Sequence, residues 1–134
     1  MAVFSSSEEL YNVLRALFDR IKVEEPDATR TVLSTKLAIR LKLMAPDADI
    51  FINGKKNPLT INYGSREGRA DLELDIPADM FHEIMLGELT LKKAFASGRV
   101  KLRGPIWKSF ALGDIFQQGQ AIYPVILDEF GIGT

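Results

Sequence analysis

The chain has 134 residues, of which 46% are hydrophobic and 26% charged, so it is neither disordered nor fibrous, and we expect a single domain spanning 1–134. Its net charge of −1, with both signs spread along the sequence, provides no basic stripe for phosphates and argues against a nucleic-acid partner. Cysteine is absent, which excludes disulfides, thiolate metal sites and thiol nucleophiles and suits a cytoplasmic location.

The first predicted element is a helix that begins after a run of serines. Ser5 to Ser7 precede Glu8 and Glu9, and this Ser-x-x-Glu arrangement satisfies the free amides of a helix start. Pro26 ends any continuation of the helix. One apolar face follows from the spacing of Leu10, Val13, Leu14, Leu17, Phe18 and Ile21.

From Leu37 the hydrophobic period changes to two, which predicts a strand over 37–44 with one buried face. Three more short runs, 50–52, 59–63 and 72–76, are separated by turn-forming residues, so we predict an antiparallel meander. The outward positions carry charges of opposite sign, and we expect them to pair across strands on a solvated face. These residues are Arg40, Lys42, Asp71, Glu73, Asp75, Lys101 and Arg103.

The second half of the chain is predicted to be mainly helical. A helix begins after Pro77 and stops at Gly87, and another runs from Thr90 to Gly98. A short strand with Val100 and Leu102 on its inner face follows. The stretch 106–118 predicts a helix broken or kinked near its glycine at 113, and 123–130 predicts a last helix. No segment has the roughly 18 apolar residues of a membrane span, so we expect no integral membrane segment.

Catalytic residues are sparse. His82 is the only histidine and lies on the helix side opposite Met80 and Ile84, so we expect it on the surface. No Gly-x-Ser-x-Gly sequence presents a serine nucleophile. An esterase or thioesterase that uses Ser97 or Ser109 with His82 is the enzymatic alternative. Our prediction is that the chain is not an enzyme.

Cofactor and metal motifs are also missing. Neither a P-loop nor a dinucleotide-binding glycine motif occurs. Asp47 and Asp49 lie beside Pro46, which predicts a turn instead of a metal site. We therefore expect no cofactor and no metal.

Large apolar side chains gather in the C-terminal half. Rings and flexible thioethers suit an adaptable apolar pocket, although the same residues could simply fill the core. We expect ligand contacts from Phe81, Met85, Phe95, Trp107, Phe110, Phe116, Tyr123, Ile126 and Phe130. Trp107 is the only tryptophan; we expect it at the mouth of the cavity, where lipid entry would change its fluorescence.

Two consecutive segments resemble the signature of the type-2 sterol carrier proteins. The first is Phe81-His82-Glu83-Ile84-Met85-Leu86-Gly87-Glu88-Leu89, and the second is Ala94-Phe95-Ala96-Ser97-Gly98-Arg99-Val100-Lys101-Leu102-Arg103-Gly104. The helix before them, the strands and the later helices follow the family's order. The resemblance implies an α+β fold: a five-stranded, mainly antiparallel sheet with helices packed on one face, enclosing an apolar cavity.

The resemblance also implies a function. It indicates a stand-alone, prokaryotic-type member that binds and transfers or presents a lipid without covalent chemistry: a fatty acyl chain, acyl-CoA, an isoprenoid or a sterol-like molecule. Its partner would be that lipid, with transient membrane contact during exchange. The alternative is a non-catalytic accessory subunit that supports a partner enzyme of lipid or quinone metabolism, with its interior filled by its own side chains.

Overall fold

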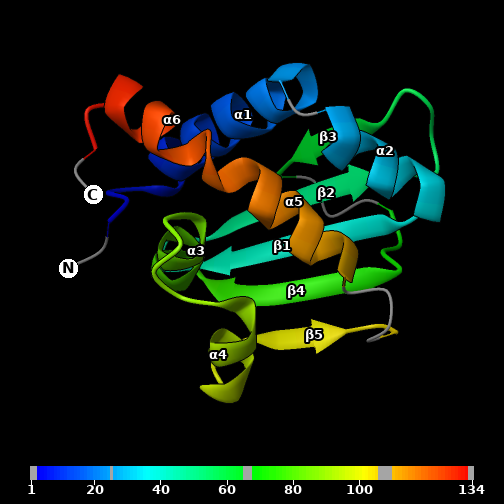
Figure 1. Ribbon diagram of the computed structural model, residues 1–134. Helices are drawn as coiled ribbons and strands as arrows, with labels where there is room; N and C mark the ends of the chain where they lie inside the picture. Colours follow the sequence, from blue (N-terminus) through cyan, green and yellow to red (C-terminus); the bar gives the residue numbers. More distant parts are fainter. Residues whose placement is uncertain (1–2, 25, 65–67, 106–109, 133–134) are drawn as a thin grey trace.

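A mixed β-sheet carries helices on one of its faces (Figure 1). The computed structural model describes residues 3–24, 26–64, 68–105 and 110–132. The helices α1, α2, α5 and α6 lie on the covered face, α3 lies at the end of the central strands, and α4 lies beside the edge strand β5. In chain order the elements are α1 (Ser7–Glu24), α2 (Pro26–Thr35), β1 (Ala38–Met44), β2 (Ala48–Asn53), β3 (Thr60–Tyr63), β4 (Leu72–Pro77), α3 (Ala78–Met85), α4 (Leu91–Ala96), β5 (Lys101–Arg103), α5 (Phe110–Gln120) and α6 (Tyr123–Glu129).

The sheet has five strands in the order β3-β2-β1-β4-β5. The central strand β1 pairs antiparallel with β2, Leu41 opposite Ile50, and parallel with β4, Leu41 opposite Leu74. The pairs β2–β3 and β4–β5 are antiparallel. The prediction of a five-stranded, mainly antiparallel sheet is confirmed. The predicted meander is wrong, because β4 lies beside β1 and not beside β3.

This strand order places the connection from β3 to β4 against the open face of the sheet. Gly68, in that connection, accepts a hydrogen bond of 3.3 Å from Nη1 of Arg40, and a Cβ on Gly68 would lie 2.9 Å from the ring of Phe51. The Arg40 guanidinium stacks 4.9 Å from the Phe51 ring centre and pairs with Asp49 at 3.2 Å. Arg40 is therefore buried, so its predicted place on a solvated face is wrong.

Four of the other outward charges form the expected cross-strand pairs, whereas Asp71 pairs with Lys55 of the β2–β3 connection at 3.2 Å and Lys101 forms no ion pair among the described residues. Lys42 pairs with Glu73 at 2.7 Å, and Arg103 pairs with Asp75 at 3.5 Å and with Glu73 at 3.7 Å. The hydrogen bond from Lys42 is the main cause that lowers the pKa of Glu73. These ion pairs connect β1, β4 and β5 on the open face.

The two N-terminal helices follow from local signals. Glu9 N donates to Ser6 Oγ at 3.1 Å, and Ser5 N donates to Glu9 Oε1 at 2.9 Å, so the predicted capping interactions are confirmed. The predicted apolar face of α1 is buried against the sheet. Pro26 does end the first helix, but it also begins α2, a helix that the sequence analysis missed.

The ends of α3 and α4 are also as expected. Thr90 caps α4 by accepting a hydrogen bond from Lys93 N at 3.1 Å. Gly87 and Gly98 have φ values of 77° and 76°, the left-handed conformation that favours glycine after a helix. Helix α5 is continuous through Gly113, so the predicted break there is wrong. Among the described residues, none of the helices combines the length and the apolar character needed to cross a membrane.

His82 is buried, which contradicts its predicted place on the surface. Its Nδ1 lies 2.6 Å from Tyr123 Oη, so the side chains of α3 and α6 are joined in the interior. The Phe4 ring contacts the imidazole edge-on at 5.9 Å between centres. The helical period placed His82 opposite Met80, but α6 and the N-terminal segment cover that side of α3 as well.

Burial of the His82–Tyr123 pair predicts a pH-dependent stability. Burial lowers the pKa of His82 below 6.5, against the opposing effect of the carboxylates of Glu88, Asp79 and Glu83. The unfolded state therefore binds more protons than the folded state as the pH falls below 6.5, so the free energy of unfolding should decrease in that range. Urea denaturation at about pH 7.5 and about pH 5.5 measures this decrease.

The variant His82→Gln retains a hydrogen-bonding group for Tyr123 but does not titrate in this range. Its free energy of unfolding should be lower overall and should fall less between the two pH values. An equal fall in both proteins would show that other groups cause the pH dependence, and would contradict the assignment to His82.

Candidate functional site

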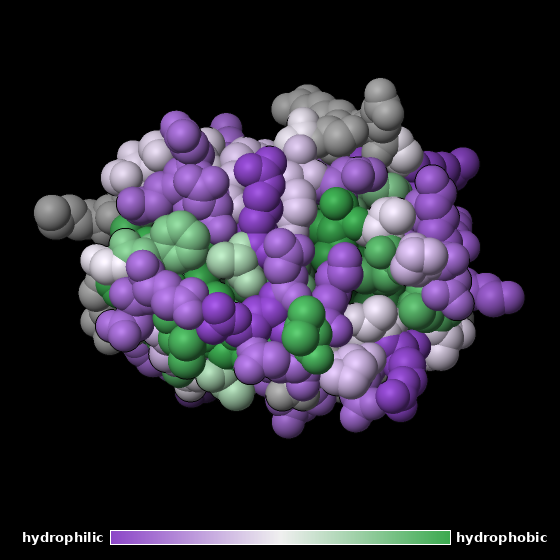
Figure 2. Space-filling view, turned by 90° about the horizontal axis from the view of Figure 1, so that it is seen from above, coloured by the Kyte–Doolittle hydropathy of each residue, from purple (hydrophilic) through white to green (hydrophobic). Residues whose placement is uncertain are grey.

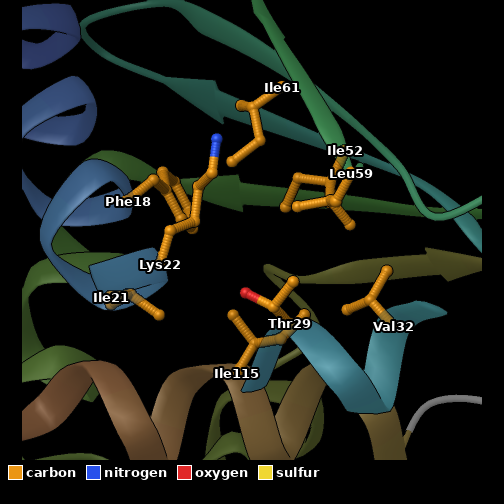
Figure 3. A pocket seen from close by; sticks show the side chains of 9 residues that line it. All are labelled: Phe18, Ile21, Lys22, Thr29, Val32, Ile52, Leu59, Ile61 and Ile115. Carbon is orange, nitrogen blue, oxygen red and sulfur yellow. The ribbon is translucent and has the colours of Figure 1, made fainter. Parts of the chain in front are cut away.

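An apolar pocket lies where α1 and α2 meet the β2–β3 edge of the sheet (Figure 3). The β3 strand brings Ile61 to the inner face of the sheet, opposite Ile52 of β2. Helix α5 closes the pocket from the other side with Ile115. All nine lining residues are Phe18, Ile21, Lys22, Thr29, Val32, Ile52, Leu59, Ile61 and Ile115.

The pocket wall contains two polar side chains, Lys22 and Thr29. Figure 3 shows the Lys22 side chain extending along the pocket, with its Nζ on the side of Ile61, while the Thr29 hydroxyl comes from α2. Lys22 is exposed and forms no ion pair within the described part of the chain. A cation at the mouth of an apolar wall is suited to a ligand with an anionic end and a hydrocarbon body.

The apolar pocket is narrow. It encloses about 290 Å³ with its open mouth included, but the centre of a water-sized sphere can reach only about 20 Å³ of it. That reachable space corresponds to about one water molecule, far below the roughly 300 Å³ of small-molecule sites. A long hydrocarbon chain therefore enters only if the helices around the pocket move apart.

The wall formed by α2 is buried near its middle and exposed at its beginning. Its Val32 side chain packs directly against Gly54, where a Cβ would lie 2.6 Å from Val32 Cγ1. Its first residues, Pro26 and Asp27, are exposed, and Thr29 is half-buried. Helix α2 packs on α1 and α5. The first residues of α2 therefore bury less surface than Val32 does.

A second hollow, which we call the side groove, lies on the other side of α5. Gly87, Leu89 and Leu91 line it from the α3–α4 side, and Phe116 and Gln117 line it from α5. Water-sized spheres reach about 300 Å³ of this groove, so it is much more open than the apolar pocket. Ile115 and Phe116 are neighbours in the chain but line different hollows.

The structure places four of the nine expected ligand residues in the core instead of in the apolar pocket. Phe81, Met85, Tyr123 and Ile126 are at most 1% exposed. The Phe81 ring contacts Phe116 and Tyr123 edge-on, at 5.9 and 6.3 Å between centres. These contacts form an aromatic cluster between α3, α5 and α6.

The other expected residues are dispersed. Phe95 is half-buried on α4, Phe116 borders the side groove, and Phe130 is 42% exposed after α6. Trp107 and the Phe110 side chain lie outside the described residues, so their predicted contacts stay predictions.

Sequence reasoning missed the pocket residues because it favoured rings and thioethers. The pocket is lined mainly by aliphatic side chains whose spacing is that of ordinary helix and strand core positions. Lys22 was the one feature of the sequence that could have indicated this pocket. It follows Ile21 on α1 and lies four residues after Phe18, so a cation borders the apolar face of the helix.

The catalytic alternative has no support in the described geometry. His82 bonds Tyr123, and Ser97 Oγ donates to the carbonyl of Ala94 at 2.6 Å. Ser109 lies outside the described residues. Within the described ranges, no three His, Cys, Asp or Glu side chains come together as a metal site.

Comparisons with known proteins give one consistent family. The model of the SCP-2 sterol transfer family matches residues 15–117. A protein of Yarrowia lipolytica named fatty acid-binding protein is 22% identical over 118 residues, which are 86% of this chain and 92% of that protein.

Solved structures of sterol carrier proteins share the fold of this chain. The apo form of sterol carrier protein 2 from Yarrowia lipolytica has a TM-score of 0.62 at 20% identity, covering 85% of this chain and 91% of that one. The sterol carrier protein domain 2 of Helicoverpa armigera has a TM-score of 0.64 at 18% identity, covering 84% and 88%. At these identities the structures show a shared fold, and the family model shows more: the chain belongs to the SCP-2 sterol transfer family.

Proposed function

We propose that the chain binds a single-chain lipid non-covalently in the apolar pocket and carries or presents it. The observation behind this proposal is an aliphatic pocket with one exposed, unpaired lysine at its mouth, among the described residues. A fatty acid would lay its chain between α1, α2 and α5 and place its carboxylate near Lys22 and Thr29. The relative in Yarrowia lipolytica that is named a fatty acid-binding protein supports this class of ligand.

Entry of the chain requires the pocket to widen. The start of α2 would move away from the β3 edge while Val32 stays packed on Gly54. Each methylene that leaves water contributes about 0.8 kcal/mol. A long acyl chain therefore gains enough free energy to offset the loss of a few helix contacts.

A bulky side chain on the inner face of β3 should block lipid binding. Ile61 is half-buried and faces the apolar pocket, so Ile61→Trp fills the space that the acyl chain would enter. We expect palmitate binding, measured by displacement of a fluorescent fatty acid, to fall by at least about tenfold.

The matched control is Asn62→Trp. Asn62 is the next residue of the same strand, points to the opposite face of the sheet and is exposed. It should leave palmitate binding unchanged. If wild-type protein binds no palmitate, or if Ile61→Trp binds it as well as Asn62→Trp does, the proposed site is wrong.

Replacing the lysine at the pocket mouth should affect charged lipids alone. Lys22→Met keeps an unbranched apolar stem and removes the ammonium, so palmitate should bind about tenfold more weakly because a charge-assisted contact of about 1.5 kcal/mol is lost. Hexadecanol has the same chain without the charge and should bind wild type and variant equally.

Lys56→Met is the control for the loss of one positive charge, since Lys56 is exposed in the β2–β3 connection and lines neither hollow. Equal weakening of palmitate and hexadecanol by Lys22→Met would mean that Lys22 shapes the pocket instead of recognising the carboxylate.

The accessory-subunit function is a second candidate, because the aromatic cluster fills the interior beneath α5. Met85 is 1% exposed, and its Cε lies 2.7 Å from the position of a Cβ on Gly119. Such packing stabilises the fold without leaving room for a ligand.

Met85→Ala separates a filled interior from an open tunnel. With a filled interior it should reduce the free energy of unfolding by about 2–5 kcal/mol. Met44→Ala, at a residue 39% exposed, is the control and should cost far less. Urea denaturation measures both. A loss below about 1 kcal/mol together with weaker palmitate binding would instead identify Met85 as a tunnel wall.

A further inference from the structure

One stretch of the sequence concentrates positive charge. Residues 89–113 contain six Lys and Arg residues and no Asp or Glu. The rest of the chain therefore contains 11 of the 17 basic residues and all 18 acidic residues. This asymmetry is hidden by the net charge of −1, which is nearly neutral.

The fold gathers the described cations of this stretch at one edge of the molecule. Strand β5 is the edge of the sheet opposite β3, and α4 lies next to it (Figure 1). Lys92, Lys93, Arg99 and Lys101 are all exposed on this α4–β5 segment, which we call the basic edge. Arg103, at the end of β5, differs from them because it pairs with Glu73 and Asp75.

The four cations of the basic edge have no ion-pair partner within the described ranges. Many other charged side chains there are paired, as in Arg20 with Glu129 and Lys42 with Glu73. Lys92 and Lys93 occupy the outer side of α4, and Lys101 projects from the open face of the sheet with Arg103. Lys101 lies opposite Asp75 in the strand register but forms no ion pair among the described residues, so the basic edge carries an excess of positive charge.

Apolar side chains accompany these cations. Leu91 and Phe95 lie four residues apart on α4, and both are half-buried. Leu89, which precedes the helix, is also half-buried. Leu89 and Leu91 also form one wall of the side groove. The basic edge therefore lies directly beside an apolar hollow that opens to solvent.

The side of the molecule opposite α4 and β5 has a different surface. Figure 2 shows hydrophobic residues reaching the surface in separate places, with hydrophilic residues between them. On that side Arg20 is paired with Glu24 and Glu129, and Arg30 with Asp27. The α4–β5 side differs because four exposed cations gather there beside half-buried apolar side chains, whereas the apolar pocket has the single cation Lys22.

We propose that the basic edge docks on an anionic lipid bilayer, with Leu91 and Phe95 against the headgroup boundary and the side groove facing the membrane. Lysines and arginines are drawn to the negative surface potential of such a bilayer, and apolar side chains add to this attraction by entering the interface. An acidic protein surface would satisfy the charges but would leave the side groove unused. This docking rests on the proposed lipid-carrier function, because a carrier has to meet the membrane that holds its lipid. Docking is nevertheless measured independently of palmitate binding.

Co-sedimentation of the full chain with vesicles tests this surface. Vesicles of phosphatidylcholine with about one third phosphatidylserine should bind the protein, and pure phosphatidylcholine vesicles should not. Binding should weaken strongly when added salt shortens the Debye length from about 10 Å to about 3 Å. Failure to bind the anionic vesicles, or equal binding to both kinds, would overturn the proposal.

Matched pairs of charge substitutions locate the docking surface. Lys92→Gln with Lys93→Gln should weaken binding to the anionic vesicles roughly tenfold. Lys36→Gln with Lys56→Gln removes the same charge from other exposed positions and should change binding less than about twofold. Equal effects of the two pairs would show general charge attraction and refute the basic edge.

Two further measurements separate this proposal from its alternatives. Ile61→Trp, which blocks the apolar pocket, should still sediment with anionic vesicles; loss of sedimentation would mean that the pocket, and not the basic edge, makes the contact.

Soluble polyglutamate at the same ionic strength should compete weakly with the vesicles. If polyglutamate binds the basic edge more tightly than the vesicles do, the edge is a protein-docking surface and the membrane proposal fails. Vesicle binding without any palmitate binding would refute the carrier function and leave the docking surface intact.

Discussion

The parallel pairing of β1 with β4 determines most of the architecture. Two parallel neighbours need a connection that returns to the starting end of the sheet, and here that connection contains the whole β2–β3 hairpin. The chain then has to cross from the β3 edge to the far side of β1. In this crossing Gly68 lies against Arg40 and Phe51. The position requires glycine, because a side chain here would collide with the Phe51 ring. The carboxylate of Asp49, 3.2 Å from Nε of Arg40, offsets the buried positive charge at this crossing.

The same strand order explains where the apolar pocket lies. The central strands β1 and β4 lie behind the helix layer and contact α3 at their ends, and their inner side chains are fully buried. Strand β3 is an edge strand of four residues, and the helix nearest to it, α2, packs on α1 and α5. Ile61 and Leu59 are therefore covered less tightly than the centre of the sheet. The space between them and α2 is the apolar pocket.

Local features of the sequence predicted the elements well. Helical spacing identified α1, alternation identified β1 and β4, and the glycines at 87 and 98 marked helix ends. Direction of pairing could not be predicted this way, because a period of two is the same in parallel and antiparallel strands. Helix α2 was missed because a proline that ends one helix can also begin the next.

Burial and the position of the site were harder to predict. The period of α3 placed His82 on the outer side of that helix, but burial also depends on α6 and Phe4, which are distant in sequence. The expected ligand residues were chosen for their size and flexibility, and those same properties suit the aromatic cluster that fills the interior. The pocket residues instead come from five elements and share no local pattern: Phe18, Ile21, Lys22, Thr29, Val32, Ile52, Ile61 and Ile115, with Leu59 beside β3.

Helix α5 connects the two proposals, because it separates the apolar pocket from the side groove. Ile115 lines one hollow and Phe116 the other, and Gly119 lets the helix approach Met85 closely. The basic edge is at the β5 side of the sheet, whereas Lys22 is at the β3 side. The two hollows therefore lie on opposite sides of α5, and the aromatic cluster fills the interior between α3, α5 and α6. Gln120, which donates to the carbonyl of Ile84 at 2.9 Å, holds the end of α5 on α3.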